Sequence, residues 1–196
     1  MNYELQFEYL VARLTPQLGE NEIAQVRRAY EVAQAAHLGQ MRDEGTPYIV
    51  HPIRVAVCLV DELGLYSTKL ICSALLHDVI EDSAVTREDI SEWFDDEIAE
   101  IVWLLTKLEE VSLREYLARI EEARDTGAPI VKLCDRLDNL RSVIHTPRLE
   151  KKRRYIRTTE EHYLPLAART NRYLYDELQR WLDEARGHVQ TVMRDQ

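Results

Sequence analysis

The sequence contains little glycine or proline, with six of each among 196 residues. Because these residues form turns and interrupt regular structure, their scarcity predicts few turns and a predominance of helices. No run of 18 or more apolar residues is present, and no basic segment followed by an apolar one marks a leader. No membrane partner is therefore expected, and we expect a cytoplasmic protein.

Cysteine and positive charge are also sparse. The three cysteines, Cys58, Cys72 and Cys134, are odd in number, widely spaced and set in apolar surroundings, which predicts buried free thiols. Lys and Arg number 25 against 35 Asp and Glu, giving a formal net charge of -10. Binding to nucleic acid requires a basic surface, so no such partner is expected. An anionic substrate would need a local cluster of cations or a metal.

What the sequence does contain is apolar residues repeated at helical spacing, with no segment that alternates at period two. The first helix is predicted over residues 2–14 and the last over about 174–185. Helix caps are predicted at Asn21, Ser67, Thr86 and Ser112, and Pro52 is predicted to be the first residue of its helix. We predict an all-α protein with a single domain over residues 1–196 and roughly ten helices.

Four polar residues follow the apolar stretch 70–76. A single helix is predicted to carry His77, Asp78, Glu81 and Asp82 in its last two turns, within reach of one patch. Three carboxylates at the negative end of a helix destabilise it unless a cation is present. An imidazole with carboxylate oxygens favours Mn, Fe or Zn over Ca. The alternative is a polar helix end exposed to water, and this stretch alone leaves both interpretations open.

Two further candidates lie far away in the chain. His51 immediately precedes Pro52, and Asp135 shares a polar helix face with Asn139 and Ser142. A metal site in a helical protein draws ligands from several helices, so both are candidate ligands. Taken singly, a histidine at such a position is usually a cap, and a helical aspartate is usually solvated.

In combination these segments resemble the hydrolase domain of RelA/SpoT homologues, within the HD superfamily of metal-dependent phosphohydrolases. The segments that carry the resemblance are His37–Arg42, Gly45–Pro52, Ala74–Asp82, Thr106–Lys107, Lys132–Asn139 and Tyr163–Ala167. It extends over about residues 37–167, so the chain looks like a stand-alone small alarmone hydrolase. Such enzymes remove the 3′-pyrophosphate of ppGpp or pppGpp, which yields GDP or GTP and pyrophosphate.

The resemblance also implies roles for individual residues. One Mn²⁺ would be bound by His51, His77, Asp78 and Asp135. The water would be handled by Glu81 and Asp82. The guanine nucleotide would be bound by Arg42 at the base, by Lys107 and Arg136 near the phosphates, and by Asn139 and Ser142, the latter where Thr is common.

Three positions depart from the family pattern: Asp43 replaces a usual Lys, Asp138 a frequent His, and Ser83 a frequent Thr. Asp43 is expected to weaken the attraction of phosphate, so Asp43→Lys is predicted to lower the Michaelis constant. The basic run 151–154 is interpreted as a solvated face, with contact to distal phosphates as the alternative.

These departures leave other functions open. One is phosphohydrolysis of another nucleotide, such as a nucleoside monophosphate or NADPH, and another is a catalytically silent nucleotide-sensing module. The sequence also leaves a homo-oligomer open.

Overall fold

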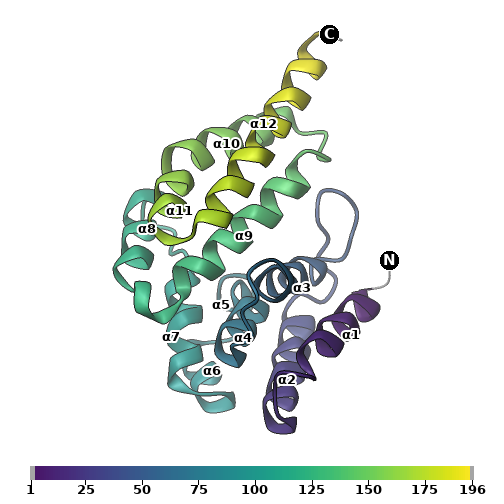
Figure 1. The fold of residues 1–196 in the computed structure, drawn as a ribbon, viewed down its shortest axis with the longest axis vertical. Helices are drawn as coiled ribbons and strands as arrows, with labels where there is room; N and C mark the ends of the chain where they lie inside the picture. Colours follow the sequence, from purple (N-terminus) through teal and green to yellow (C-terminus); the bar gives the residue numbers. More distant parts are fainter. Residues whose placement is uncertain (1–2, 195–196) are drawn as a thin grey trace.

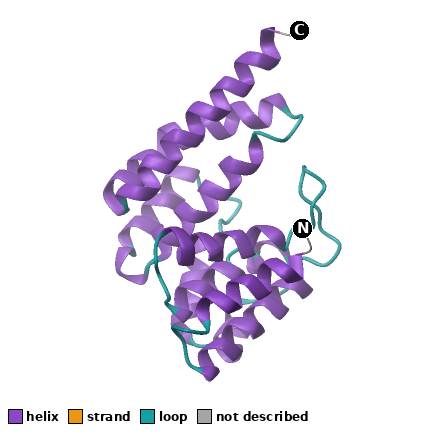
Figure 2. Ribbon diagram, turned by 45° about the vertical axis from the view of Figure 1, so that its right-hand side comes forward, coloured by secondary structure: helices purple, strands orange, loops and turns teal. Residues whose placement is uncertain are grey.

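The computed structural model describes residues 3–194, and within them it contains α-, π- and 3₁₀-helices but no β-strand (Figure 2). The predicted all-α fold is therefore confirmed, although residue 2, where the first predicted helix begins, lies outside the described residues. The α-helices are α1 (Tyr3–Leu14), α2 (Glu20–Ala36), α3 (Val50–Val57), α4 (Thr68–Leu76), α5 (Val79–Asp82), α6 (Arg87–Trp93), α7 (Asp96–Leu105), α8 (Leu113–Glu122), α9 (Ala128–Val143), α10 (Leu149–Thr158), α11 (Leu164–Thr170) and α12 (Arg172–Arg194).

Helix α4 forms the centre of the core. Every residue from Leu70 to Leu76 is buried, and the helix packs against α2, α3, α7 and α9. Helix α9 also packs against α10 and α12, so it lies between the N-terminal and C-terminal helices (Figure 1). Since burying one Leu or Ile side chain contributes about 1.5–3 kcal/mol, α4 is a firm support for the polar residues at its C-terminal end.

Several predicted helix caps are confirmed. Ser67, Thr86 and Ser112 each accept a hydrogen bond from a backbone N–H in the first turn of α4, α6 and α8. Thr86 and Ser112 form complete capping boxes with the acidic residues three positions later. The three cysteines are buried and free, as predicted.

Two predicted helix starts are wrong by two residues. Helix α2 begins before Asn21, because Glu22 accepts a hydrogen bond from the Gly19 N–H at 2.8 Å and so completes the cap there. Helix α3 begins at Val50, which makes Pro52 its third residue. The first N–H groups of a helix have no partner within it, so proline fits anywhere in the first turn.

The predicted continuous helix through Asp82 is also wrong, because it breaks between Leu76 and Val79. His77 Nδ1 lies 2.8 Å from the Ala74 carbonyl oxygen, which is the acceptor that the Asp78 N–H would use in a continued α-helix. The side chain of His77 thus competes with the backbone, and a separate short helix, α5, follows.

Two π-helices are further interruptions. Cys58–Glu62 extends α3, and Thr159–Tyr163 joins α10 to α11. Pro165 lies in the first turn of α11, so the departure from α-helical geometry precedes it.

Candidate active site

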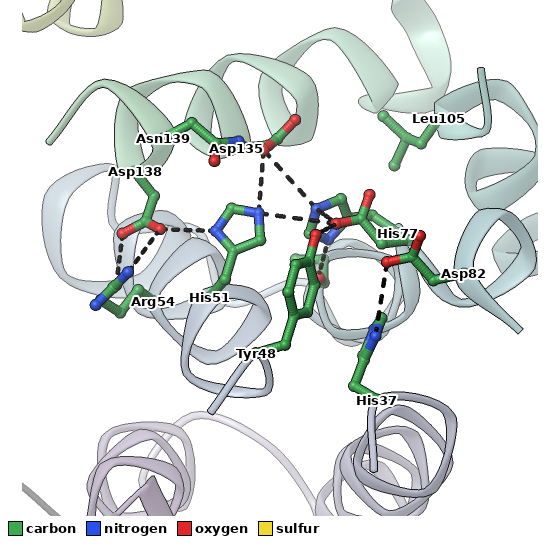
Figure 3. Close-up of polar contacts among 12 residues, drawn as sticks. His37, Tyr48, His51, Arg54, His77, Asp82, Leu105, Asp135, Asp138 and Asn139 are labelled. Carbon is green, nitrogen blue, oxygen red and sulfur yellow. Dashed lines mark hydrogen bonds and ion pairs between the residues drawn. The ribbon is translucent and has the colours of Figure 1, made fainter. Parts of the chain in front are cut away.

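The four predicted metal ligands converge from α3, from the break after α4, and from α9 (Figure 3). His51 Nε2 lies 3.1 Å from Asp135 Oδ1 and 3.9 Å from Asp78 Oδ2. His77 Nε2 lies 3.1 Å from Asp78 Oδ2 and 3.9 Å from Asp135 Oδ1. Ligand atoms of His51, His77 and Asp78 all lie within 4.8 Å of one another. The arrangement has the donor types and the dimensions of a small cation site.

The hydrogen bonds of the two imidazoles show which nitrogen is free. A backbone carbonyl can only accept, so His77 Nδ1 must donate to the Ala74 oxygen. His51 Nδ1 likewise faces Asp138 Oδ2 at 2.7 Å. Both Nε2 atoms therefore face the carboxylates, and His77 Nε2 is buried with no hydrogen-bond partner among the described residues. A divalent cation would satisfy this atom, so the donor set fits a metal.

The charges at this site are strongly coupled. Burial opposes ionisation of Asp135, but Lys132, with Nζ at 2.8 Å, and the two imidazoles hold its pKa well below the usual range. The pKa of Asp78 is lowered by the neighbouring imidazoles in spite of burial. Burial also disfavours a charged His51, but hydrogen bonds to Asp135 and Asp138 outweigh it and raise the pKa of His51 to about 9. Without a metal, bound protons offset the negative charge of the carboxylates. A bound cation would displace these protons.

Glu81 and Asp82 lie beyond this cluster on α5. Glu81 Oε2 accepts a hydrogen bond from the backbone N–H of Lys107 at 3.0 Å. Asp82 Oδ2 lies 3.8 Å from His37 Nδ1 (Figure 3). Partial burial, followed by the charge of Asp78, raises the pKa of both carboxyl groups. Neither residue belongs to the group of closely spaced ligand atoms in the described structure.

Two adjoining cavities open beside the cluster. The larger, of about 590 Å³, is lined by Asp78, Asp135 and Glu81 together with the cations Lys107, Arg136 and Arg154. The smaller, of about 170 Å³, is lined by Arg42, Asp43, Ser142 and Lys151 among others. Tyr48, Asn139 and Tyr155 line both. The predicted substrate residues thus divide into two groups that meet at Asn139.

Asn139 connects the cluster to Arg42. Its Nδ2 donates to Asp135 Oδ1, and its Oδ1 accepts from Arg42 Nη2 at 3.2 Å. Arg42 also donates to Glu44 at 2.9 Å and lies over the Tyr48 ring. Arg42 is therefore held at the mouth of the smaller cavity with its guanidinium oriented.

Arg136 is buried, with 7% of the residue exposed. An arginine that contacts phosphate at the protein surface would be more exposed. It donates to the Tyr155 carbonyl and to the hydroxyls of Thr158 and Thr159. Its guanidinium lies 4.4 Å from the ring centres of both Tyr155 and Tyr163. Because Nε and Nη2 are engaged, Arg136 can act on a substrate through Nη1 or as a fixed positive charge.

Asp43, which was expected to weaken the attraction of phosphate, is paired with two cations. Its Oδ2 lies 2.6 Å from Lys151 Nζ, and its Oδ1 lies 3.4 Å from Arg148. These cations lower the pKa of Asp43. The solvated-face interpretation of the basic run is wrong at Lys151, which is paired with Asp43, and at Lys152, which is 6% exposed. Arg153 and Arg154 are exposed, as that interpretation expects.

Several residues that contact the cluster were not among the predicted site residues. Tyr48 donates to Asp78 Oδ2 at 2.5 Å, and Lys132 pairs with Asp135. Asp138 lies between His51 and Arg54. Tyr48 and Lys132 stand inside the motifs that carried the resemblance, and Lys132 precedes Asp135 by three helical positions, which was an available signal.

The HD domain family matches residues 29–171, so the chain belongs to this family and the resemblance drawn from the motifs is confirmed. Membership in a family of metal-dependent hydrolases implies a divalent metal, in keeping with the convergent His and Asp side chains.

Relatives and solved structures agree with this assignment. The bifunctional (p)ppGpp synthase/hydrolase SpoT of Escherichia coli K12 is 40% identical over 173 residues, covering 83% of this chain and 24% of that protein. A guanosine-3′,5′-bis(diphosphate) 3′-pyrophosphohydrolase of Vibrio cholerae is 41% identical over 162 residues, covering 78% and 22%. The chain thus spans about a quarter of these relatives' length. A solved metazoan ortholog of SpoT, described as hydrolysing ppGpp, matches with a TM-score of 0.72 and 25% identity over 82% of this chain and 95% of that one.

Among the described residues, none of the helices is long and apolar enough to span a membrane.

Proposed function

We propose that this chain hydrolyses the 3′-pyrophosphate of ppGpp and pppGpp, releasing pyrophosphate and GDP or GTP. The observation that carries the proposal is the convergence of two histidines and two aspartates at a cavity lined by Lys107, Arg136 and Arg154. The names of the relatives support the same reaction.

The metal of this proposal is Mn²⁺, held by His51, His77, Asp78 and Asp135. Imidazole nitrogen with carboxylate oxygen suits a borderline divalent ion of this kind. When bound, such an ion polarises a phosphoryl oxygen and acidifies a water. Tyr48 and Lys132 hydrogen-bond or pair with Asp78 and Asp135 and so orient the carboxylates.

Glu81 and Asp82 would handle the attacking water. Both have a raised pKa, so each is suited to take a proton and pass it on. The backbone N–H of Lys107 fixes Glu81 at the cavity wall. Asp82 lies beside the buried His37, whose Nδ1 is 3.8 Å from Asp82 Oδ2.

The two cavities would bind different parts of the substrate. The guanine base would enter the smaller cavity beside Arg42, whose guanidinium can stack on an aromatic base. The 3′-pyrophosphate would enter the larger cavity, where Lys107, Arg136 and Arg154 provide local positive charge against the net charge of -10. Between the base and the 3′-pyrophosphate, the nucleoside would contact Asn139 and Ser142.

The test is incubation of ppGpp with protein and Mn²⁺, followed by anion-exchange chromatography. The expected products are GDP and pyrophosphate in equal amounts. His77→Ala should give neither, while Arg172→Ala, at an exposed pair on α12, is the matched control. If ppGpp survives and NADPH or a nucleoside monophosphate loses phosphate instead, ppGpp is the wrong substrate and that nucleotide takes its place. Tight nucleotide binding without turnover would indicate a sensing module.

A further inference from the structure

Two helices present paired polar residues to one another behind the metal cluster. Helix α3 carries His51 and Arg54 three positions apart, and α9 carries Asp135 and Asp138 three positions apart. Residues with this spacing lie on one face of a helix, so the two pairs meet side by side (Figure 3). Asp135 faces the Nε2 side of the His51 ring, and Asp138 faces the Nδ1 side.

Asp138 is fixed on both of its oxygens. Its Oδ2 lies 2.7 Å from His51 Nδ1, and Arg54 donates to it through Nε at 2.7 Å and Nη2 at 3.2 Å. Arg54 Nη2 also donates to Ser142 at 3.0 Å. Asp138 is 5% exposed, and a buried carboxylate is unfavourable unless it is paired. The two-point contact with Arg54 supplies that pairing.

An ionised carboxylate only accepts hydrogen bonds, so Asp138 keeps a ring proton of His51 on Nδ1, and Nε2 is the nitrogen that can bind a metal once its own proton is displaced. Nε2 is the atom that faces Asp78 and Asp135. A histidine, which is frequent at position 138 in the resembled family, can donate or accept and does not impose one tautomer. In this chain the acceptor is charged and is itself held by Arg54.

His77 provides an internal comparison. Its tautomer is fixed by the backbone carbonyl of Ala74, which no side-chain substitution removes. The tautomer of His51 instead depends on two side chains, Asp138 and Arg54. The two imidazoles can therefore be perturbed separately.

We infer that Asp138, held by Arg54, is a positioning residue that fixes His51 in the tautomer and orientation of a metal ligand. The inference rests on the proposed metal site but on no particular substrate. Removing a group that orients a metal-bound histidine typically weakens metal affinity 10–100-fold. We expect Asp138→Asn to fall in this range, because an amide can present either a donor or an acceptor to His51 Nδ1.

The experiment uses the full chain, stripped with a chelator and titrated with Mn²⁺ by calorimetry in the absence of nucleotide. The variants are Asp138→Asn, Asp138→His and Arg54→Gln, and the control is Asp176→Asn at an exposed pair on α12. The expected dissociation constants rise about 10–100-fold for Asp138→Asn and less for Arg54→Gln. Asp138→His should also weaken binding, since its ring can donate or accept and imposes no tautomer on His51.

Two further readouts separate positioning from loss of structure. The melting temperature of each metal-free variant reports its fold, and the visible spectrum of Co²⁺-loaded protein reports ligand geometry. A changed Co²⁺ spectrum with weaker affinity supports the inference. Parental affinity and spectrum in a folded Asp138→Asn overturn it. If Asp138→Asn does not fold, Arg54→Gln decides on the same two criteria.

Different experimental results would contradict the role of Asp138 and the proposed function. If ppGpp is not hydrolysed but Asp138→Asn weakens Mn²⁺ binding, only the substrate is wrong. If His77→Ala keeps full metal content, the ligand set itself is wrong, and the role of Asp138 fails with it.

Discussion

The pairing of Asp43 with Lys151 leads to a prediction opposite to the one drawn from the sequence. The two residues join the loop between α2 and α3 to the start of α10, and both line the smaller cavity beside Arg42. Asp43→Lys would place a third cation against Lys151 and Arg148. We therefore expect the substitution to displace the loop and raise the Michaelis constant for ppGpp.

The magnitude follows from the distances and the exposure. Like charges at about 4 Å repel by about 4 kcal/mol at an effective dielectric constant of about 20. The side chain of Lys151 is 32% exposed, so solvent and salt reduce this figure to about 1–2 kcal/mol. Since 1.4 kcal/mol is tenfold, we expect the Michaelis constant to rise about 5–30-fold, with a small change in turnover.

The assay is initial-rate kinetics on ppGpp for a double-mutant cycle: parent, Asp43→Lys, Lys151→Asp and the charge-swapped double variant. The double variant should recover part of the loss, because the pair is restored in reverse. Asp43→Asn should raise the Michaelis constant only a few-fold. A lower Michaelis constant in Asp43→Lys, or strictly additive effects, would refute the reasoning and restore the prediction made from the sequence.

Three further outcomes are expected. Mn²⁺ at about 100 times its dissociation constant should stabilise the protein by about 2.7 kcal/mol and so raise its melting temperature. His77→Ala should abolish this rise, and elemental analysis of the variant should find no bound metal. Glu81→Gln and Asp82→Asn should each keep the metal but lose most turnover. If either variant loses metal as completely as His77→Ala does, the substituted residue belongs among the ligands. Gly127→Ala should destabilise the fold by about 2–4 kcal/mol in chemical denaturation, because Gly127 has φ of 86° and an added Cβ would lie 2.5 Å from Leu70 Cδ2; an unchanged midpoint would contradict this.

The sequence predicted well what local chemistry determines. The caps at Ser67, Thr86 and Ser112 depend on residues three positions apart, and the apolar spacing of α4 and α9 depends on burial along one helix. The convergence of His51, His77, Asp78 and Asp135 was reached through resemblance, since spacing along single helices does not show which helices meet.

What the sequence did not predict depends on contacts between distant segments or on side chains that compete with the backbone. The Asp43–Lys151 pair joins residues 108 positions apart, so a local count of charge did not include it. The break at His77 arises because its ring bonds to the Ala74 carbonyl. In a continuous helix, adjacent residues point about 100° apart, whereas His77 and Asp78 both lie in the break between α4 and α5 and reach one site from there.

The π-helix Thr159–Tyr163 has a consequence for the tolerance of this region to changes in length. Tyr155 and Tyr163 are eight positions apart, which in a regular α-helix is about 80° beyond two full turns, yet both rings cover Arg136. One extra residue taken up by the π-turn brings the rotation back to within about 20° of two turns. Deleting one exposed residue such as Glu161 would therefore convert the turn to regular α-helix and leave the two tyrosines in phase.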